Sequence, residues 1–152
     1  MELKPAIYRY CDYQERCHQE VRNKLYELGA TTLEVESLIT DLIEDDMLNE
    51  ERFAKAFSRG KFNHKKWGKG KIRRELKMRK ISDYCIKKGL AEIDEDEYER
   101  VLEKLAERWW EHYKAAKPQW AREMKTVQYL VSRGFESVPA REAVQRAAAG
   151  EL

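Results

Sequence analysis

The stretch Leu48–Ile81, LNEERFAKAFSRGKFNHKKWGKGKIRRELKMRKI, decides the fold of this chain. Its apolar residues recur three and four positions apart, first at Phe53 and Phe57 and then at Ile72 and Leu76, which is the spacing of one face of a helix. Asn49 precedes the first stripe, where its side chain can cap a helix start. The stretch therefore predicts two amphipathic helices joined by a lysine-rich loop with two glycines.

The same helical spacing continues on both sides of this stretch and recurs at a fixed period. Three sets of positions match one another at offsets of 51 and 54 residues: Val21, Leu25 and Ile39; Ile72, Leu76 and Leu90; Thr126, Leu130 and Val144. Gly29 and Gly134 follow a predicted helix at matching positions in the first and third sets. Only seven glycines and three prolines are present, too few for the turns of an all-β domain.

These observations predict an all-α protein built from three tandem three-helix repeats. The predicted domains are residues 1–48, 49–93 and 94–152. Units of this size bury little surface alone, so we expect neighbouring repeats to pack in series into an elongated, curved body.

Charge is distributed unevenly over the three predicted repeats. The chain carries a net charge of +2, but residues 1–48 have a net charge of −6, residues 49–93 of +10 and residues 94–152 of −2. Between Arg52 and Lys80 there are thirteen basic residues and one acid, Glu75, so we expect the run to have almost no compensating partners. Either this run is a solvated face, or it meets an anionic surface such as nucleic acid. The residues predicted to bind are Arg52, Lys55, Arg59, Lys65, Lys66, Lys69, Lys71, Arg73, Arg74 and Lys77.

Four tryptophans accompany these charges. Trp67 lies inside the basic run and can either stack on a base or pack between repeats. For Trp109, Trp110 and Trp120 we expect packing.

The sequence offers no active site. The three histidines are far apart, no cysteine or histidine pair has zinc-ligand spacing, and the segment Lys66–Lys71 lacks the spacing of a phosphate-binding loop. We expect no catalytic residues, no metal and no cofactor, and a role for the glycine-rich segment as a turn that starts a helix and exposes lysines. Three cysteines are too few for a disulfide scaffold, and no apolar run reaches the length of a membrane span or a signal peptide, so we expect a cytoplasmic protein with reduced thiols and no membrane contact.

The central stretch resembles the signature of the bacterial RecX family. The resemblance rests on Leu48–Ala54 and on Gly68–Leu76 with Ile81. It extends to Glu20–Leu25 with Gly29 and to Tyr129–Leu130 with Arg133–Phe135.

The resemblance implies a non-enzymatic regulator of the RecA recombinase. Family members are similar in binding the RecA filament on single-stranded DNA, and they mostly inhibit its ATPase, strand-exchange and coprotease activities in DNA repair, DNA recombination and the SOS response. The expected partners are the RecA filament, single-stranded DNA and, without sequence specificity, duplex DNA, and we expect a monomer. The alternative is a general helical nucleic-acid-binding protein with no recombinase partner.

The chain departs from the family pattern at Lys80, where a glycine commonly precedes the isoleucine. A residue with a Cβ atom adopts the left-handed conformation only at a cost. The sequence therefore leaves open whether the helix that contains Ile72 and Leu76 ends in a left-handed cap.

Overall fold

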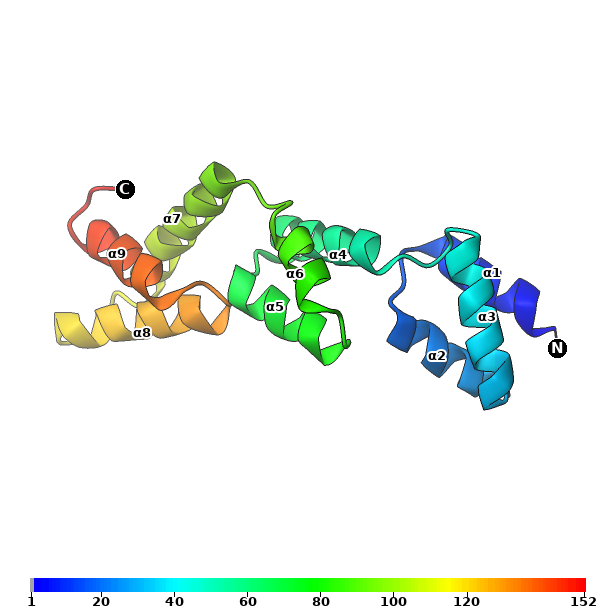
Figure 1. Ribbon diagram of the computed structural model, residues 1–152. Coiled ribbons are helices and arrows are strands. Elements are labelled where there is room, and N and C mark those ends of the chain that lie inside the picture. Colours follow the sequence, from blue (N-terminus) through cyan, green and yellow to red (C-terminus); the bar gives the residue numbers. More distant parts are fainter. Residues whose placement is uncertain (1) are drawn as a thin grey trace. The chain divides into compact units, whose positions relative to one another are not determined.

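The computed structural model describes residues 2–152, which form nine α-helices and no strand (Figure 1). The helices are α1 (Leu3–Tyr13), α2 (His18–Glu27), α3 (Thr32–Glu44), α4 (Glu50–Lys65), α5 (Lys69–Met78), α6 (Asp83–Leu90), α7 (Glu95–His112), α8 (Gln119–Ser132) and α9 (Ser137–Ala148). This confirms the predicted all-α class.

Side chains cap the starts of α4 and α7, and the first of these caps is the predicted Asn49. The Asn49 side-chain oxygen accepts a hydrogen bond from the Arg52 N–H at 2.9 Å, and the Asp94 carboxylate accepts one from the Glu97 N–H at 2.9 Å. Each cap satisfies a backbone donor that the first turn of a helix leaves without an intrahelical partner. Pro139 lies inside the first turn of α9, where a missing N–H costs no hydrogen bond.

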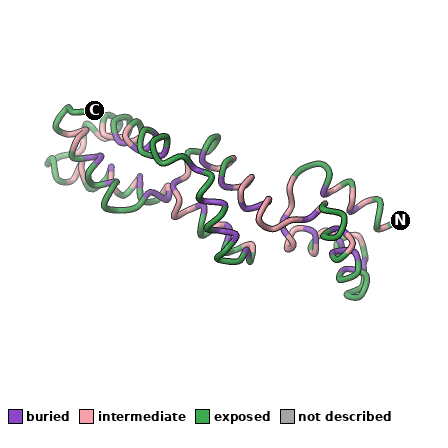
Figure 2. The backbone as a smooth tube through the Cα atoms, turned by 45° about the horizontal axis from the view of Figure 1, so that its top comes forward, coloured by how far each residue is buried: buried purple, intermediate pink, exposed green. Residues whose placement is uncertain are grey.

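The three-helix repetition is present in the structure. All nine residues of the three matching sets are buried, and Val21, Leu25, Ile72, Leu76, Thr126 and Leu130 have no exposed surface. In Figure 2 buried and exposed positions alternate along the helices, as expected when each helix turns one face inward.

The second helix of each repeat also ends in the same way. The N–H groups of Ala30, Ile81 and Phe135 donate to the carbonyls of Leu25, Leu76 and Leu130, at 3.0, 3.1 and 3.1 Å. The residue before each of these donors has a positive φ: +93° at Gly29, +60° at Lys80 and +103° at Gly134. This is the Schellman pattern of helix termination. The cap that the sequence left open is thus left-handed, although its residue is a lysine.

The chain divides into two compact units. The first comprises the residues up to Phe57 together with Leu76–Gly89, and the second comprises Ser58–Glu75 and Leu90–Leu152. This division splits the second predicted domain, residues 49–93, between the two units. The boundaries of the three predicted domains stay predictions.

In the first unit, α1, α2 and α3 enclose an aliphatic core. Its buried members include Ile7, Leu25, Val35 and Leu42. The three cysteines of the chain are free and buried, and burial raises the pKa of Cys11 and of Cys17 to about 11.

In the second unit, α7, α8 and α9 pack on one another, and an aromatic cluster ties them to α4. The Tyr98 ring lies 5.7 Å from the Phe62 ring and 5.2 Å from the Phe135 ring, measured between centroids. Phe62 comes from α4 and Phe135 follows α8, so Tyr98 of α7 joins segments from two predicted repeats.

No helix in residues 2–152 is both long enough and apolar enough to cross a membrane.

Candidate nucleic-acid interface

Helix α5 presents the clearest basic face. Ile72 and Leu76 are buried on one side, and the exposed side chains of Arg73, Arg74 and Lys77 follow on the other. Since an α-helix turns about 100° per residue, these three cations fall within one arc opposite the two buried residues. The Lys77 side chain is 59% exposed, and its contact with Asp83, at 3.9 Å, is long for an ion pair. The face predicted on this helix therefore exists and is open to solvent.

A second group of cations surrounds Trp67, between α4 and α5. The Lys61 and Lys71 amino groups lie 4.9 and 4.5 Å from the centroid of the Trp67 ring, distances at which a cation is attracted to an aromatic face. Lys65 and Lys66 precede the ring and are exposed. Trp67 therefore holds one lysine from each helix close together, and it is half-buried in the second unit.

Three predicted residues on α4 form ion pairs. Arg52 contacts Glu15 at 2.7 Å and Asp46 at 3.1 Å, Lys55 contacts Glu51 at 3.1 Å, and Arg59 contacts Glu92 at 2.6 Å. Glu15 and Glu92 lie 37 and 33 residues away in the sequence from their partners. The expectation that the basic run has almost no compensating partners is therefore wrong, because Glu15 and Glu92 reach it from distant segments and Glu51 lies one turn away on α4.

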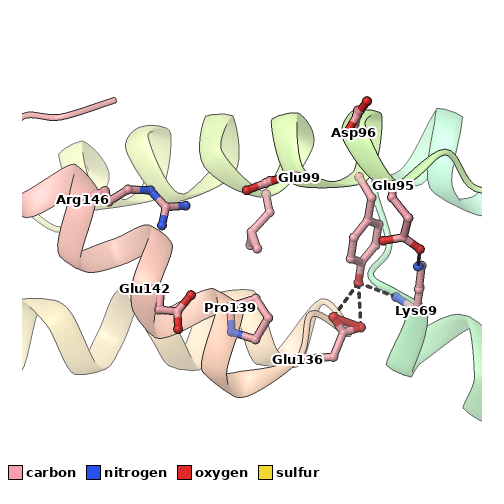
Figure 3. A pocket seen from close by; sticks show the side chains of 10 residues that line it. Lys69, Glu95, Asp96, Glu99, Glu136, Pro139, Glu142 and Arg146 are labelled. Carbon is pink, nitrogen blue, oxygen red and sulfur yellow. Dashed lines mark hydrogen bonds and ion pairs between the residues drawn. The ribbon is translucent and has the colours of Figure 1, made fainter.

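Lys69 is the most enclosed of the predicted residues whose side-chain exposure is given. Its side chain is 18% exposed, its amino group pairs with the Glu95 carboxylate, and it lies 4.7 Å from the centroid of the Tyr98 ring (Figure 3). The expectation that the glycine-rich turn exposes its lysines is thus wrong for Lys69. Because Lys69 is already paired with Glu95 of α7, its charge stabilises the fold and is less available to a ligand than an exposed lysine.

The glycines of this turn make a backbone joint, which we define as the contact of Gly68 and Gly70 with Arg133 and Gly134. The Gly68 N–H donates to the Arg133 carbonyl at 2.7 Å, and the Gly70 N–H donates to the Gly134 carbonyl at 2.8 Å. A Cβ atom on Gly70 would lie 2.8 Å from the Gly134 oxygen, closer than real Cβ contacts. Glycine is needed here because two backbones approach each other without room for side chains.

Tyr98 completes the joint from α7. Its hydroxyl accepts a hydrogen bond from the Lys69 N–H at 2.9 Å and donates to the Glu136 carboxylate at 2.9 Å. Burial, followed by the charge of Glu136, raises the pKa of Tyr98 well above its usual range, so the hydroxyl stays protonated and can donate. The start of α5 is thereby fixed in position, and with it the direction in which Arg73 and Arg74 project.

Sequence reasoning missed Tyr98, Arg133 and Glu136 as positioning residues. The Arg133 guanidinium donates to the Lys65 carbonyl at the end of α4, and its own carbonyl accepts from Gly68. The one sequence feature that points to this region is Gly134, which matches Gly29 in the first repeat, because a glycine after a helix marks a left-handed cap.

The other tryptophans have two different environments. Trp109 stacks on Tyr129 with ring centroids 3.8 Å apart, and the Arg122 guanidinium lies 3.7 Å from the centroid of the Trp110 ring. Trp120 is 63% exposed, so the expectation that it packs is wrong. In residues 2–152 no three or more His, Cys, Asp or Glu side chains are grouped so that they could hold a metal ion.

Three-helix repeats with a solvent-facing basic helix place this chain in a class of all-helical repeat modules. Two models of known three-helix domains match this chain: the second three-helix domain of RecX matches residues 49–90, and the third three-helix domain of RecX matches residues 95–144. Together they cover more than half of the chain, which therefore belongs to the RecX family.

Curated relatives agree with this assignment. The chain is 26% identical over 130 residues to the "Regulatory protein RecX" of Streptococcus uberis, covering 86% of this chain and 49% of that protein. It is 28% identical over 128 residues to the protein of the same name from Limosilactobacillus reuteri, covering 84% and 48%. It spans about half the length of these two relatives, but 89% of the Ralstonia nicotianae relative, to which it is 26% identical over 148 residues.

Solved structures share the fold. A crystal structure of RecX from Lactobacillus salivarius superposes with a TM-score of 0.84 at 23% identity, covering 97% of this chain and 95% of that one. A further crystal structure of regulatory protein RecX gives a TM-score of 0.82 at 24% identity, covering 94% and 71%. At these identities the likeness establishes the fold.

Proposed function

We propose that this chain binds the RecA filament on single-stranded DNA and regulates it, mostly by inhibiting its ATPase, strand-exchange and coprotease activities. The observation that carries the proposal is the exposed face of α5 with Arg73, Arg74 and Lys77, held in a chain of the RecX family. The chain acts in this proposal as a non-enzymatic regulator in the cytoplasm, in DNA repair, recombination and SOS control.

Nine of the ten predicted cations divide into two groups by what they contact inside the protein, and the tenth, Lys71, lies over the Trp67 ring. Lys65, Lys66, Arg73, Arg74 and Lys77 are exposed and supply the first contacts with phosphate groups. Arg52, Lys55, Arg59 and Lys69 are held by carboxylates and serve the fold first. Phosphate contacts of the first group give an affinity that falls with salt and carries no base information.

The acidic first repeat has a different role in the proposal. With a net charge of −6 over residues 1–48, it is repelled by DNA and attracted to basic protein surface. A molecule that contacts the DNA and a recombinase subunit together favours one state of the filament over others. Inhibition then follows if the favoured state of the filament hydrolyses ATP slowly or extends slowly.

The test is RecA ATP hydrolysis on single-stranded DNA, titrated with this protein at two salt concentrations. We expect hydrolysis to fall at protein concentrations too low to coat the DNA, and the double variant Arg73→Glu/Lys77→Glu to need about tenfold more protein for half inhibition. Arg100→Glu/Lys104→Glu is the matched control, because it reverses two charges at the same four-residue spacing on α7.

Two results count against the proposal. Full potency in the α5 double variant, with inhibition by the wild type intact, removes the basic face from the mechanism. Binding to single strands with no effect on hydrolysis favours the alternative, a nucleic-acid-binding helical protein without a recombinase partner.

A further inference from the structure

The strained backbone of Lys80 has no counterpart in the other two repeats. The equivalent positions, 51 residues before and 54 residues after it, are Gly29 and Gly134, and all three have a positive φ. Glycine adopts this conformation without cost, whereas the Cβ atom of lysine clashes with the neighbouring carbonyl. A residue that strains the backbone where glycine would not is retained when its side chain has a use.

Lys80 lines a small pocket in the first unit. The pocket has a volume of about 140 Å³, and its polar lining comes from the start of α2, the start of α4 and the end of α5: His18, Gln19, Arg22, Glu50, Arg79 and Lys80. Three permanent cations therefore face one carboxylate. None of the six belongs to the ten residues that the sequence predicted to bind.

The internal contacts of these residues leave Lys80 as the available charge. The Glu50 carboxylate accepts a hydrogen bond from the Ser82 N–H at 2.6 Å, the Arg22 guanidinium pairs with Glu36, and the Arg79 guanidinium lies 4.8 Å from the centroid of the Phe57 ring. Across residues 2–152, no carboxylate is within ion-pair distance of the exposed Lys80 amino group.

We infer that this pocket binds one phosphate group of a nucleic-acid backbone, with Lys80 as its charged contact. A tetrahedral phosphate fits a cavity of this size, and the His18 and Gln19 side chains add polar partners beside the lysine. The inference deepens the proposed function, on which it rests, because it adds a nucleic-acid contact in the first unit. It also gives the side chain of Lys80 a use that can offset the strain of its backbone.

The experiment compares Lys80→Gly with Lys87→Ala. Both remove one exposed lysine charge from the first unit, but Lys87 lies on α6 outside the pocket. Binding to a fluorescein-labelled oligothymidylate is measured by anisotropy at several salt concentrations. For Lys80→Gly we expect about fivefold weaker binding and a slope of log K against log salt that is smaller by about 0.7, the loss of one single-strand phosphate contact. For Lys87→Ala we expect a change of less than about twofold.

The melting temperature gives the second readout. A variant that lost binding because it unfolds would have a lower melting temperature, whereas relief of strain raises it. Relief of strain should raise the melting temperature of Lys80→Gly by about 2 °C while binding weakens. Equal binding of the two variants, or a lower melting temperature for Lys80→Gly, overturns the inference.

A titration with inorganic phosphate separates this inference from the proposed function. In amide proton–nitrogen spectra we expect phosphate to shift the Gln19, Lys80 and Ile81 signals of the wild type and not those of Lys80→Gly. If these shifts appear but the protein does not bind oligothymidylate, the proposed function fails and the anion pocket stands. Absence of the shifts in the wild type overturns the pocket, and a stronger response to polyglutamate than to oligothymidylate overturns its assignment to nucleic acid.

Discussion

Glycines in this chain differ in what a side chain would meet, and this sets the cost of replacing them. Gly60 lies within α4, Gly29 has a φ of +93° in open space, and Gly134 has a φ of +103° with the Lys71 Cβ atom 2.6 Å from an added Cβ. The three positions therefore separate helix propensity, backbone strain and steric overlap.

We predict opposite effects of alanine at these positions on the free energy of unfolding, measured with urea. Gly60→Ala should raise it by about 0.5–1 kcal/mol, because alanine favours a helix interior. Gly29→Ala should lower it by about 1 kcal/mol through strain alone, and Gly134→Ala by about 3 kcal/mol through strain and overlap at the backbone joint. Equal costs at Gly29 and Gly134 would mean that the joint does not contribute to stability.

At this scale the sequence predicted the helix caps well and the roles of the charged side chains poorly. A cap is a contact between residues three apart, so Asn49 and Asp94 reveal it directly. The partners of Arg59 and Lys69 lie 33 and 26 residues away, and no local pattern encodes them. The exposure of Trp120 was missed for the same reason, since burial depends on which neighbours fold over a ring.

The helices carry their basic side chains in two states: Arg73, Arg74 and Lys77 on α5 are exposed, whereas the three α4 residues described above are paired with carboxylates. An ion pair inside the protein competes with a phosphate for the same guanidinium group. The affinity of the surface for an anionic polymer therefore depends on the carboxylates as well as on the cations.

We predict that Glu92→Gln strengthens binding to single-stranded DNA by about threefold at low salt. The amide keeps the size of the side chain but releases the charge of Arg59, whose guanidinium now lies 2.6 Å from the carboxylate. Binding is measured by anisotropy, with Glu107→Gln on α7 as a control that removes a negative charge from an exposed position with no ion pair to Arg59. If both variants bind equally, net charge alone explains the gain and the ion pair does not compete.

Periodicity predicted the elements better than any other signal. The buried residues of α2, α5 and α8 are those that the offsets of 51 and 54 residues matched, because a helix must hide the same face in each repeat. The basic face of α5 followed from the same argument. The backbone joint did not, because glycine–glycine contacts leave no apolar pattern.

Seen as a whole, the molecule divides where its contacts are few rather than where its repeats end. The second unit takes Ser58–Glu75 from the middle repeat and holds it through Phe62, Tyr98 and the backbone joint. The repeat boundaries predicted from the sequence thus differ from the boundaries of the compact units. A repeat is defined by matching helices, whereas a compact unit is defined by the surfaces that the helices bury against one another.

We predict that a fragment of residues 94–152 is less stable than one of residues 58–152. The shorter fragment lacks the Phe62 ring that packs on Tyr98 and both glycine N–H groups that donate to Arg133 and Gly134. Its melting temperature, followed by circular dichroism, should be lower by 10 °C or more, about the effect of losing 2 kcal/mol in a small domain. Equal melting temperatures would show that α7, α8 and α9 are stable without the middle repeat.

The backbone joint has a consequence for how such proteins diverge. Its bonds run between main-chain groups, which every amino acid except proline can supply, and it asks only that a few positions stay without a side chain. The surrounding residues can then be substituted. The exposed side chains of α5 can change while the backbone hydrogen bonds that hold its first turn stay the same.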